Sequence, residues 1–103
     1  MGVRSFDRIP ILMNAIITCQ DHVYRGMVTN LSEKGMFIRT YVVTPPLDPQ
    51  VEITLTIGET SISLSGRPVR SENIRGYYTG IGIEVINPPQ NYLDLFDSLL
   101  AVL

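Results

Sequence analysis

Hydrophobic and polar residues alternate most regularly between residues 51 and 57. The apolar residues there are Val51, Ile53, Leu55 and Ile57, and the residues between them are Glu52, Thr54 and Thr56. A period of two turns one face of a strand toward a core and the other toward water. Gly58-Glu59 then predicts a tight reversal into a second strand, in which Ile62 and Leu64 alternate with serines and which can continue to Val69.

Four further segments are rich in β-branched, aromatic and other apolar residues and are bounded by turn formers, as strands are. They cover residues 11–19, 22–30, 36–40 and 76–86. Gln20-Asp21 predicts the turn between the first two, and the three prolines within residues 44–50 predict a loop. Gly80 and Gly82 in the last strand indicate that another backbone passes close to it.

The hydrophobic period changes after residue 86, which predicts a C-terminal helix. Asn87 is the expected N-cap and Pro88 the expected first helical residue. A stripe of apolar side chains follows at helical spacing, formed by Tyr92, Phe96, Leu99 and Leu103 and widened by Leu93 and Leu100. The helix would have about four turns. Six short strands with tight turns favour a small antiparallel barrel, with the helix over one end or one face.

Length and charge narrow the class of protein. A chain of 103 residues is long enough for one domain, and 45% apolar residues provide a packed core. Residues 1–9 are expected to form a flexible leader, and residues 10–103 the barrel and helix. The net charge of -2 argues against a protein that binds DNA or RNA through a broad basic surface. It is compatible with a small anionic ligand held by a few arginines.

The expected location is the cytoplasm. The single cysteine excludes an internal disulfide and fits a reducing compartment. No apolar stretch approaches the length needed to cross a bilayer, so membrane insertion is not expected. The N-terminus carries Arg4, Asp7 and Arg8 in place of an apolar run, so it does not read as a signal peptide.

The segment CQDH, residues 19–22, is the one candidate for covalent catalysis. Cys19 and His22 would form a nucleophilic pair if the thiol were activated next to a substrate cleft. The favoured interpretation is a buried cysteine followed by a surface turn. One cysteine and one histidine cannot complete a zinc site within one chain, and Asp-rich metal loops are missing. We therefore expect no enzyme activity, no metal and no cofactor.

Two short polar stretches carry the candidate binding chemistry. In RSFDR, Arg4 and Arg8 offer planar guanidinium groups that can bind phosphate, grip the O6 and N7 atoms of guanine, or stack on a base. In NLSEKG, the Asn30 amide and the Ser32 hydroxyl can bond a nucleobase, and Gly35 has no Cβ to obstruct one. Taken singly, the first stretch is better explained as a solvated charged terminus and the second as a plain turn.

Together, the two stretches resemble the motifs of the PilZ domain family. The sequence has RxxxR at residues 4–8 and [D/N]xSxxG at residues 30–35, and the resemblance covers nearly the whole chain. GMFIRT follows the second motif, and GIGIEV, residues 80–85, is similar to the late glycine-bearing strand of the family. The resemblance implies a six-stranded antiparallel β-barrel with a C-terminal helix that binds the bacterial second messenger cyclic di-GMP.

The resemblance also implies which residues bind this ligand. The six positions are Arg4, Arg8, Asn30, Ser32, Gly35 and Arg70. The two N-terminal arginines would contact guanine edges and phosphates, the Asn and Ser would hold a guanine, the Gly would keep the surface open, and Arg70 would line the same site. Many relatives have Asp where this chain has Asn30. An amide has one acceptor oxygen, so weaker binding is expected rather than none.

The expected output is a signal to another protein. The leader would order over cyclic di-GMP and present a new surface to an effector protein, in control of motility or biofilm formation. The alternative is a nucleotide-independent interaction module of pilus or motility machinery. The helix that ends in LLAVL can supply a homodimer interface, although an apolar stripe of this kind is more often part of a core.

Overall fold

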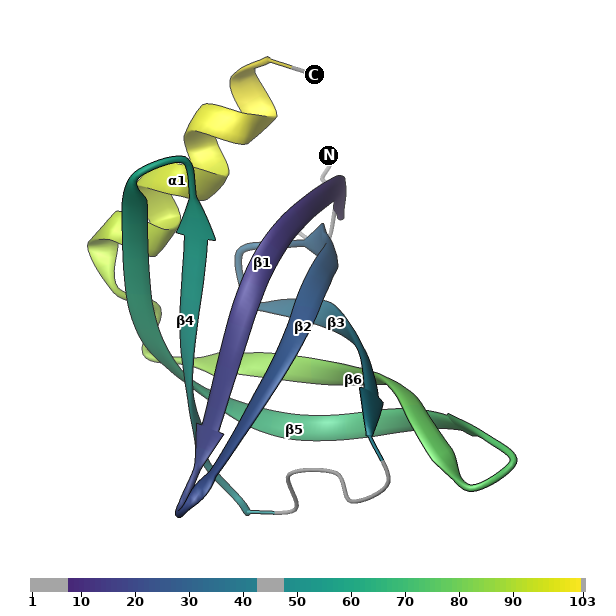
Figure 1. The fold of residues 1–103 in the computed structure, drawn as a ribbon. Coiled ribbons are helices and arrows are strands. Elements are labelled where there is room, and N and C mark those ends of the chain that lie inside the picture. Colours follow the sequence, from purple (N-terminus) through teal and green to yellow (C-terminus); the bar gives the residue numbers. More distant parts are fainter. Residues whose placement is uncertain (1–7, 43–47, 103) are drawn as a thin grey trace.

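The computed structural model describes residues 8–42 and 48–102. It contains six strands and one helix in the predicted order (Figure 1). Their bounds are β1 Ile9–Cys19, β2 His22–Leu31, β3 Gly35–Val42, β4 Val51–Ile57, β5 Thr60–Ile74, β6 Tyr77–Ile86 and α1 Gln90–Ala101. The predicted turns at Gln20-Asp21 and Gly58-Glu59 are confirmed. Among the described residues, no helix has the length and apolar character needed to cross a membrane.

The strands form one closed ring in the order β1-β2-β3-β6-β5-β4, and every neighbouring pair is antiparallel. The ring closes because β1 pairs with β4, with Ala15 opposite Leu55. The predicted six-stranded barrel with a C-terminal helix is therefore confirmed. Arg4 and most of the expected leader lie outside the described residues, but Ile9 already belongs to β1 and is buried, so the barrel begins earlier than residue 10.

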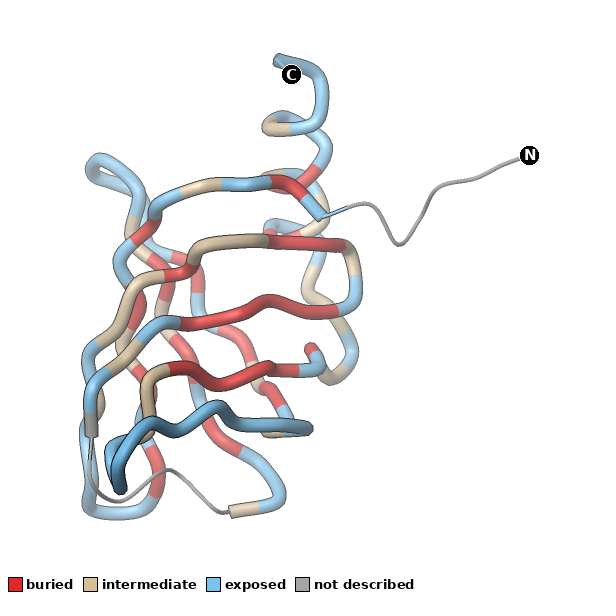
Figure 2. Tube along the Cα trace, turned by 90° about the vertical axis from the view of Figure 1, so that its right-hand side faces the viewer, coloured by how far each residue is buried: buried red, intermediate tan, exposed pale blue. Residues whose placement is uncertain are grey.

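The core fills the inside of the ring, as the red segments of Figure 2 show on every strand. The alternation in β4 is confirmed, because Val51, Ile53 and Leu55 are buried while Glu52 between them is exposed. The helix adds two side chains to this core, Tyr92 and Phe96, which confirms the main part of the predicted stripe. Leu103 lies outside the described residues.

The start of the helix differs from the prediction. Asn87 is not the N-cap and Pro88 is not helical, since α1 begins at Gln90 with Pro89 as its N-cap. The physical reason is local: a residue before proline is disfavoured in the α conformation, so Pro88 cannot begin a helix in front of Pro89. The helix has 12 residues, or about three turns.

The β5–β6 hairpin extends further than predicted and projects from the barrel (Figure 1). β5 continues to Ile74, and the chain reverses at Arg75-Gly76, where both residues have positive φ, 53° and 86°. Two central residues with positive φ match the right-handed twist of paired strands. Gly76 therefore belongs to the turn and not to the last strand.

Candidate functional site

The NLSEKG stretch is a tight turn between β2 and β3 that its own residues hold together. The backbone N–H of Ser32 donates to the carbonyl of Gly35 at 2.8 Å, and the N–H of Gly35 donates to the Ser32 hydroxyl at 3.1 Å. Ser32 is 6% exposed. The Ser32 hydroxyl, which was predicted to hold a guanine, is thus engaged inside the turn in this structure.

The turn is also bound to the rest of the fold from two sides. The N–H of Val85 in β6 donates to the carbonyl of Lys34 at 2.8 Å. From helix α1, the hydroxyl of Tyr92 donates to the carbonyl of Ser32 at 2.7 Å and lies 3.3 Å from that of Gly35. The Tyr92 side chain is fully buried, and this burial raises the pKa of its hydroxyl. The helix therefore helps to set the position of the predicted binding motif.

Glycine is required at residue 35 for a structural reason that the sequence did not reveal. A Cβ at this position would lie 2.5 Å from the carbonyl oxygen of Ile83 in the neighbouring strand β6. Such a contact cannot form without moving one of the two backbones. The close approach of β3 to β6 is thus sufficient to require glycine at residue 35, without reference to a ligand.

The structure brings together Arg8 and Asn30, one residue from each of the two polar motifs. The Arg8 Nη1 donates to the Asn30 Oδ1 at 2.7 Å across the outer end of β1 and β2. The amide oxygen of Asn30 is therefore already an acceptor for Arg8, and its NH₂ group is the part that can donate to another group. Arg4, the other predicted arginine, lies outside the described residues.

Arg8 and Arg70 line the same hollow on the outside of the barrel, which we call the arginine hollow. Its volume is about 200 Å³, and its walls also include Phe37 from β3 and Gly82 from β6. Arg70 reaches it from β5, with its guanidinium carbon 5.4 Å from the centre of the Phe37 ring. Within the described part of the chain, no carboxylate pairs with Arg70. The structure thus places two of the predicted site residues, Arg8 and Arg70, at the same hollow.

Phe37 and the glycines of β6 are members of this surface that the sequence analysis missed. Phe37 points out of the barrel, yet it is only 5% exposed because side chains cover it. Its ring occupies the space where a Cβ of Gly80 would lie, and the Arg70 side chain crosses Gly82. The glycines were predicted to admit a backbone, but side chains come close there. The available signal was the strand alternation, which turns Met36 and Ile38 inward and so turns Phe37 outward.

Both acidic and basic side chains lie around the arginine hollow, but the basic ones predominate. Arg39 lies 3.9 Å from Glu72, and its guanidinium carbon is 5.7 Å from the Phe37 ring centre. Arg67 pairs with Glu84. These pairs are about half exposed, so each contributes little to stability. With Arg8 and Arg70 beside them, the outer surface over β3, β5 and β6 suits an anionic ligand.

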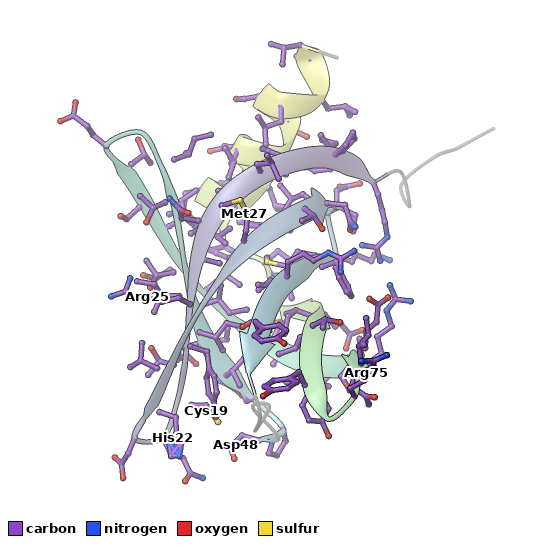
Figure 3. The ribbon with its side chains drawn as sticks, turned by 45° about the vertical axis from the view of Figure 1, so that its right-hand side comes forward. Cys19, His22, Arg25, Met27, Asp48 and Arg75 are labelled. Carbon is purple, nitrogen blue, oxygen red and sulfur yellow. The ribbon has the colours of Figure 1, made fainter. Side chains whose placement is uncertain are left out.

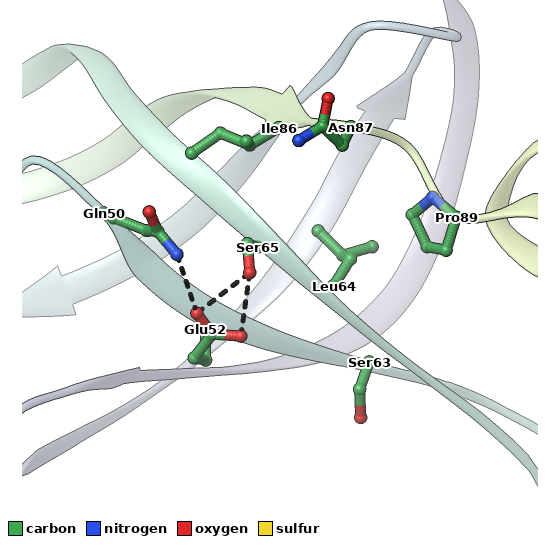
Figure 4. Close-up of a pocket in the computed structure, with 8 residues that line it drawn as sticks. All are labelled: Gln50, Glu52, Ser63, Leu64, Ser65, Ile86, Asn87 and Pro89. Atoms are coloured by element: carbon green, nitrogen blue, oxygen red, sulfur yellow. Dashed lines mark hydrogen bonds between the residues drawn. The ribbon is translucent and has the colours of Figure 1, made fainter.

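Another hollow, of about 440 Å³, has the opposite chemistry (Figure 4). Its charged group is the Glu52 carboxylate, which accepts hydrogen bonds from the Ser65 hydroxyl at 2.9 and 3.0 Å and from the Gln50 amide at 3.4 Å. None of the residues that line it is basic. A phosphate would be repelled there, so this hollow is not a candidate for the anionic ligand.

The CQDH segment is a buried cysteine at the end of a strand followed by an exposed turn, as the favoured interpretation described it. Cys19 is buried at the end of β1, and its thiol lies by Asp48 (Figure 3). Burial, and secondarily the bond to Asp48, raises the pKa of the Cys19 thiol, so it stays protonated and is a weak nucleophile at neutral pH. His22 is exposed with its ring 6.1 Å from that of Tyr24. The described residues contain no cluster of three or more His, Cys, Asp or Glu side chains that could hold a metal ion.

Comparison with solved structures gives the same fold. The chain is similar to the PilZ domain of YcgR from Escherichia coli, solved with c-di-GMP (TM-score 0.73, 12% identity, 91% of this chain and 86% of that one). It is also similar to the Bacillus subtilis inhibitor of motility MotI/DgrA (TM-score 0.76, 12% identity, 98% and 51%). A third similar structure is Borreliella burgdorferi PlzA in complex with c-di-GMP (TM-score 0.69, 13% identity, 94% and 51%). The chain spans about half of each of the last two proteins.

Sequence comparison identifies the family. A search of curated proteins finds no match. The family profile of the PilZ domain, however, matches residues 3–101. This match contains both polar motifs, all six strands of the barrel and helix α1. The chain therefore belongs to the PilZ domain family.

Proposed function

We propose that this protein is a receptor for cyclic di-GMP and binds it at the arginine hollow. The observation that carries the proposal is the convergence of Arg8 and Arg70 on one hollow, next to Asn30. Membership in the PilZ family supports it, as do the similar structures of YcgR and PlzA that contain c-di-GMP.

The chemistry of the hollow fits the two parts of this ligand. A guanidinium can bind a phosphate with two parallel hydrogen bonds or pair with the O6 and N7 atoms of guanine. Arg8 is already oriented by its bond to Asn30, which reduces the conformational entropy lost on binding. Ser32 and Gly35 contribute by shaping the turn that presents Asn30, because the Ser32 hydroxyl is bonded within that turn.

The proposal includes an N-terminal switch. Residues 1–9 carry Arg4 and Arg8, and they close over the bound ligand so that both arginines contact it. The closed segment presents a surface that the free protein lacks, and an effector protein binds that surface. As a receptor for an intracellular messenger, the chain would act in the cytoplasm.

The protein is proposed to bind its ligand without chemical conversion. The buried Cys19 thiol has a raised pKa, and His22 stacks edge-on against Tyr24 at the surface. Neither group lines the arginine hollow. The arrangement therefore offers positive charge and hydrogen-bond donors, without an activated nucleophile at the ligand.

Isothermal titration with cyclic di-GMP tests the proposal, with GTP and cyclic di-AMP as control ligands. Arg8→Ala and Arg70→Ala should each weaken binding by about 5- to 150-fold, since a bidentate arginine contact contributes about 1–3 kcal/mol. Arg25→Ala is the matched control, because Arg25 is exposed on β2 and does not line the hollow (Figure 3). The titration also gives the number of ligands bound per chain.

Two results would overturn the proposal. If the wild-type protein gives neither heat nor a thermal shift with cyclic di-GMP, the nucleotide-independent interaction module is the better function. If it binds but the Arg70→Ala variant binds as tightly as the Arg25→Ala variant, the ligand occupies a different surface.

A further inference from the structure

An apolar groove lies between helix α1 and the β4–β5 hairpin, on a surface that the ligand proposal does not use. It has a volume of about 300 Å³. Its apolar lining is Ile57 and Ile62 from the hairpin and Leu95 from the helix, and Asp94 and Ser98 stand at its helical rim. Figure 1 shows the helix passing the end of this hairpin. We call this surface the helix–hairpin groove.

The apolar surface continues from the groove along the helix. Leu95, Leu99 and Val102 are spaced four and three residues apart, so they share one side of the helix. Leu95 and Leu99 are half-buried, whereas Val102 is 79% exposed and Ile57, at the hairpin end of the groove, is 38% exposed. Figures 1 and 2 both show the last turns of α1 standing clear of the barrel. Leu95 and Leu99 pack against the core on one side, and Val102 continues the strip at the exposed end of the helix.

All charged side chains on the segments that form the groove are acidic. Residues 51–66 and 90–101, which form β4, the first half of β5 and helix α1, contain Glu52, Glu59, Asp94 and Asp97 and no Lys, Arg or His. This contrasts with the cationic surface around the arginine hollow. A partner with Lys or Arg around an apolar strip would complement this surface, whereas the same surface of a second copy would meet it with like charge.

We propose that the helix–hairpin groove binds a basic amphipathic segment of a partner protein. Apolar side chains of the segment enter the groove over Ile57, Ile62 and Leu95. Its Lys or Arg side chains face Asp94 at the rim of the groove. This is the helix-in-groove mode of recognition, in which an apolar strip gives affinity and the charged rim gives specificity. The proposal does not depend on cyclic di-GMP.

The test uses the complete 103-residue chain and two synthetic peptides. The probe is a fluorescent amphipathic peptide of about 18 residues built from Leu and Lys, long enough to be helical. In the control peptide every Lys is replaced by Glu. Fluorescence anisotropy measures affinity, and NMR chemical shifts locate the bound peptide. The expected result is binding of the Lys peptide only, with shifts at Ile57, Ile62 and Leu95.

Matched variants separate the groove from general charge attraction. Asp94→Lys and Ile57→Ser alter the rim and the lining, and each should weaken binding of the Lys peptide by about three- to tenfold. Asp21→Lys makes the same charge change in the exposed turn between β1 and β2 and should change binding less than about twofold.

Three outcomes would overturn the proposal. The first is no binding of the Lys peptide. The second is an affinity that falls equally in Asp94→Lys and Asp21→Lys, which would indicate attraction to net charge alone. The third is a concentration-dependent dimer, seen by sedimentation, that Asp94→Lys or Ile57→Ser disrupts, because a second copy would then be the occupant of the groove.

Discussion

The hydroxyl of Tyr92 gives the sharpest test of how this fold holds its ligand motif. Tyr92→Phe removes one oxygen atom from a side chain that is fully buried and otherwise keeps its shape. That hydroxyl joins helix α1 to the turn at Ser32–Gly35, which lies far from it in the sequence. The variant therefore removes the link and leaves the apolar packing of the helix in place.

The expected loss in the free energy of unfolding depends on which carbonyl acceptors lose their hydrogen-bond donor. The carbonyl of Gly35 keeps the N–H of Ser32, which donates to it at 2.8 Å. The carbonyl of Ser32 loses the hydroxyl that donates to it at 2.7 Å, and Ser32 itself is buried. One buried acceptor left without a partner costs about 1–3 kcal/mol. We expect the free energy of unfolding to fall by about 1–2 kcal/mol, or about 5–10 °C in Tm.

Urea unfolding followed by circular dichroism measures this loss. The midpoint should fall while the slope m stays the same, because the surface exposed on unfolding does not change. Tyr24→Phe is the matched control: Tyr24 is half-buried, and its hydroxyl makes no hydrogen bond to another residue in the described ranges. Amide hydrogen exchange supplies a local readout, since the N–H groups of Gly35 and Val85 should exchange faster in Tyr92→Phe.

One result would refute the reasoning. If Tyr92→Phe and Tyr24→Phe both lie within about 0.5 kcal/mol of the wild type, the hydrogen bond to Ser32 does not stabilise the turn. Faster exchange at Gly35 with unchanged affinity for cyclic di-GMP would instead show that the turn can loosen without affecting the ligand.

Three further predictions concern single groups in the fold. Gly35→Ala should destabilise the protein by about 1–3 kcal/mol, because its Cβ would meet the Ile83 carbonyl; an unchanged urea midpoint would contradict this. Cys19 should react slowly with iodoacetamide in the folded protein and quickly in urea, since burial raises the pKa of its thiol; equal rates would contradict it. Burial also raises the pKa of Tyr92 above its unfolded value of about 10, so stability should fall as pH rises beyond about 10, and the urea midpoint should fall less in Tyr92→Phe.

Local patterns in the sequence predicted the type and order of the secondary-structure elements. The alternation from Val51 to Ile57 predicted the bounds of β4, in which Ile57 alone of the four apolar residues is exposed, and the spacing of Tyr92 and Phe96 identified the buried side of the helix. These patterns are reliable because the strand and helix periods depend only on neighbouring residues. The helix start was also encoded locally, since Pro88 before Pro89 already disfavours a helix there.

The candidate site was predicted in part. The family resemblance singled out Arg8, Asn30 and Arg70, and the structure places Arg8 beside Asn30 and brings Arg70 to the same hollow as Arg8. The sequence did not reveal that the Ser32 hydroxyl is bonded within its own turn, or that Gly35 is needed by the neighbouring strand. The sequence of a turn does not distinguish a hydroxyl that faces a ligand from one that bonds to the backbone of the turn.

The sequence by itself thus determined which segments are strands, which is a helix, and which polar groups are candidates for a ligand. Only the tertiary structure decided which of those groups meet. Arg8 and Arg70 share a hollow because the ring order β1-β2-β3-β6-β5 puts the strand that follows Arg8 and the strand that carries Arg70 on the two sides of β3 and β6. Tyr92 reaches Ser32 because the helix returns over the barrel. Such contacts depend on strand order and register, which join residues distant in the chain and leave no periodic trace in it.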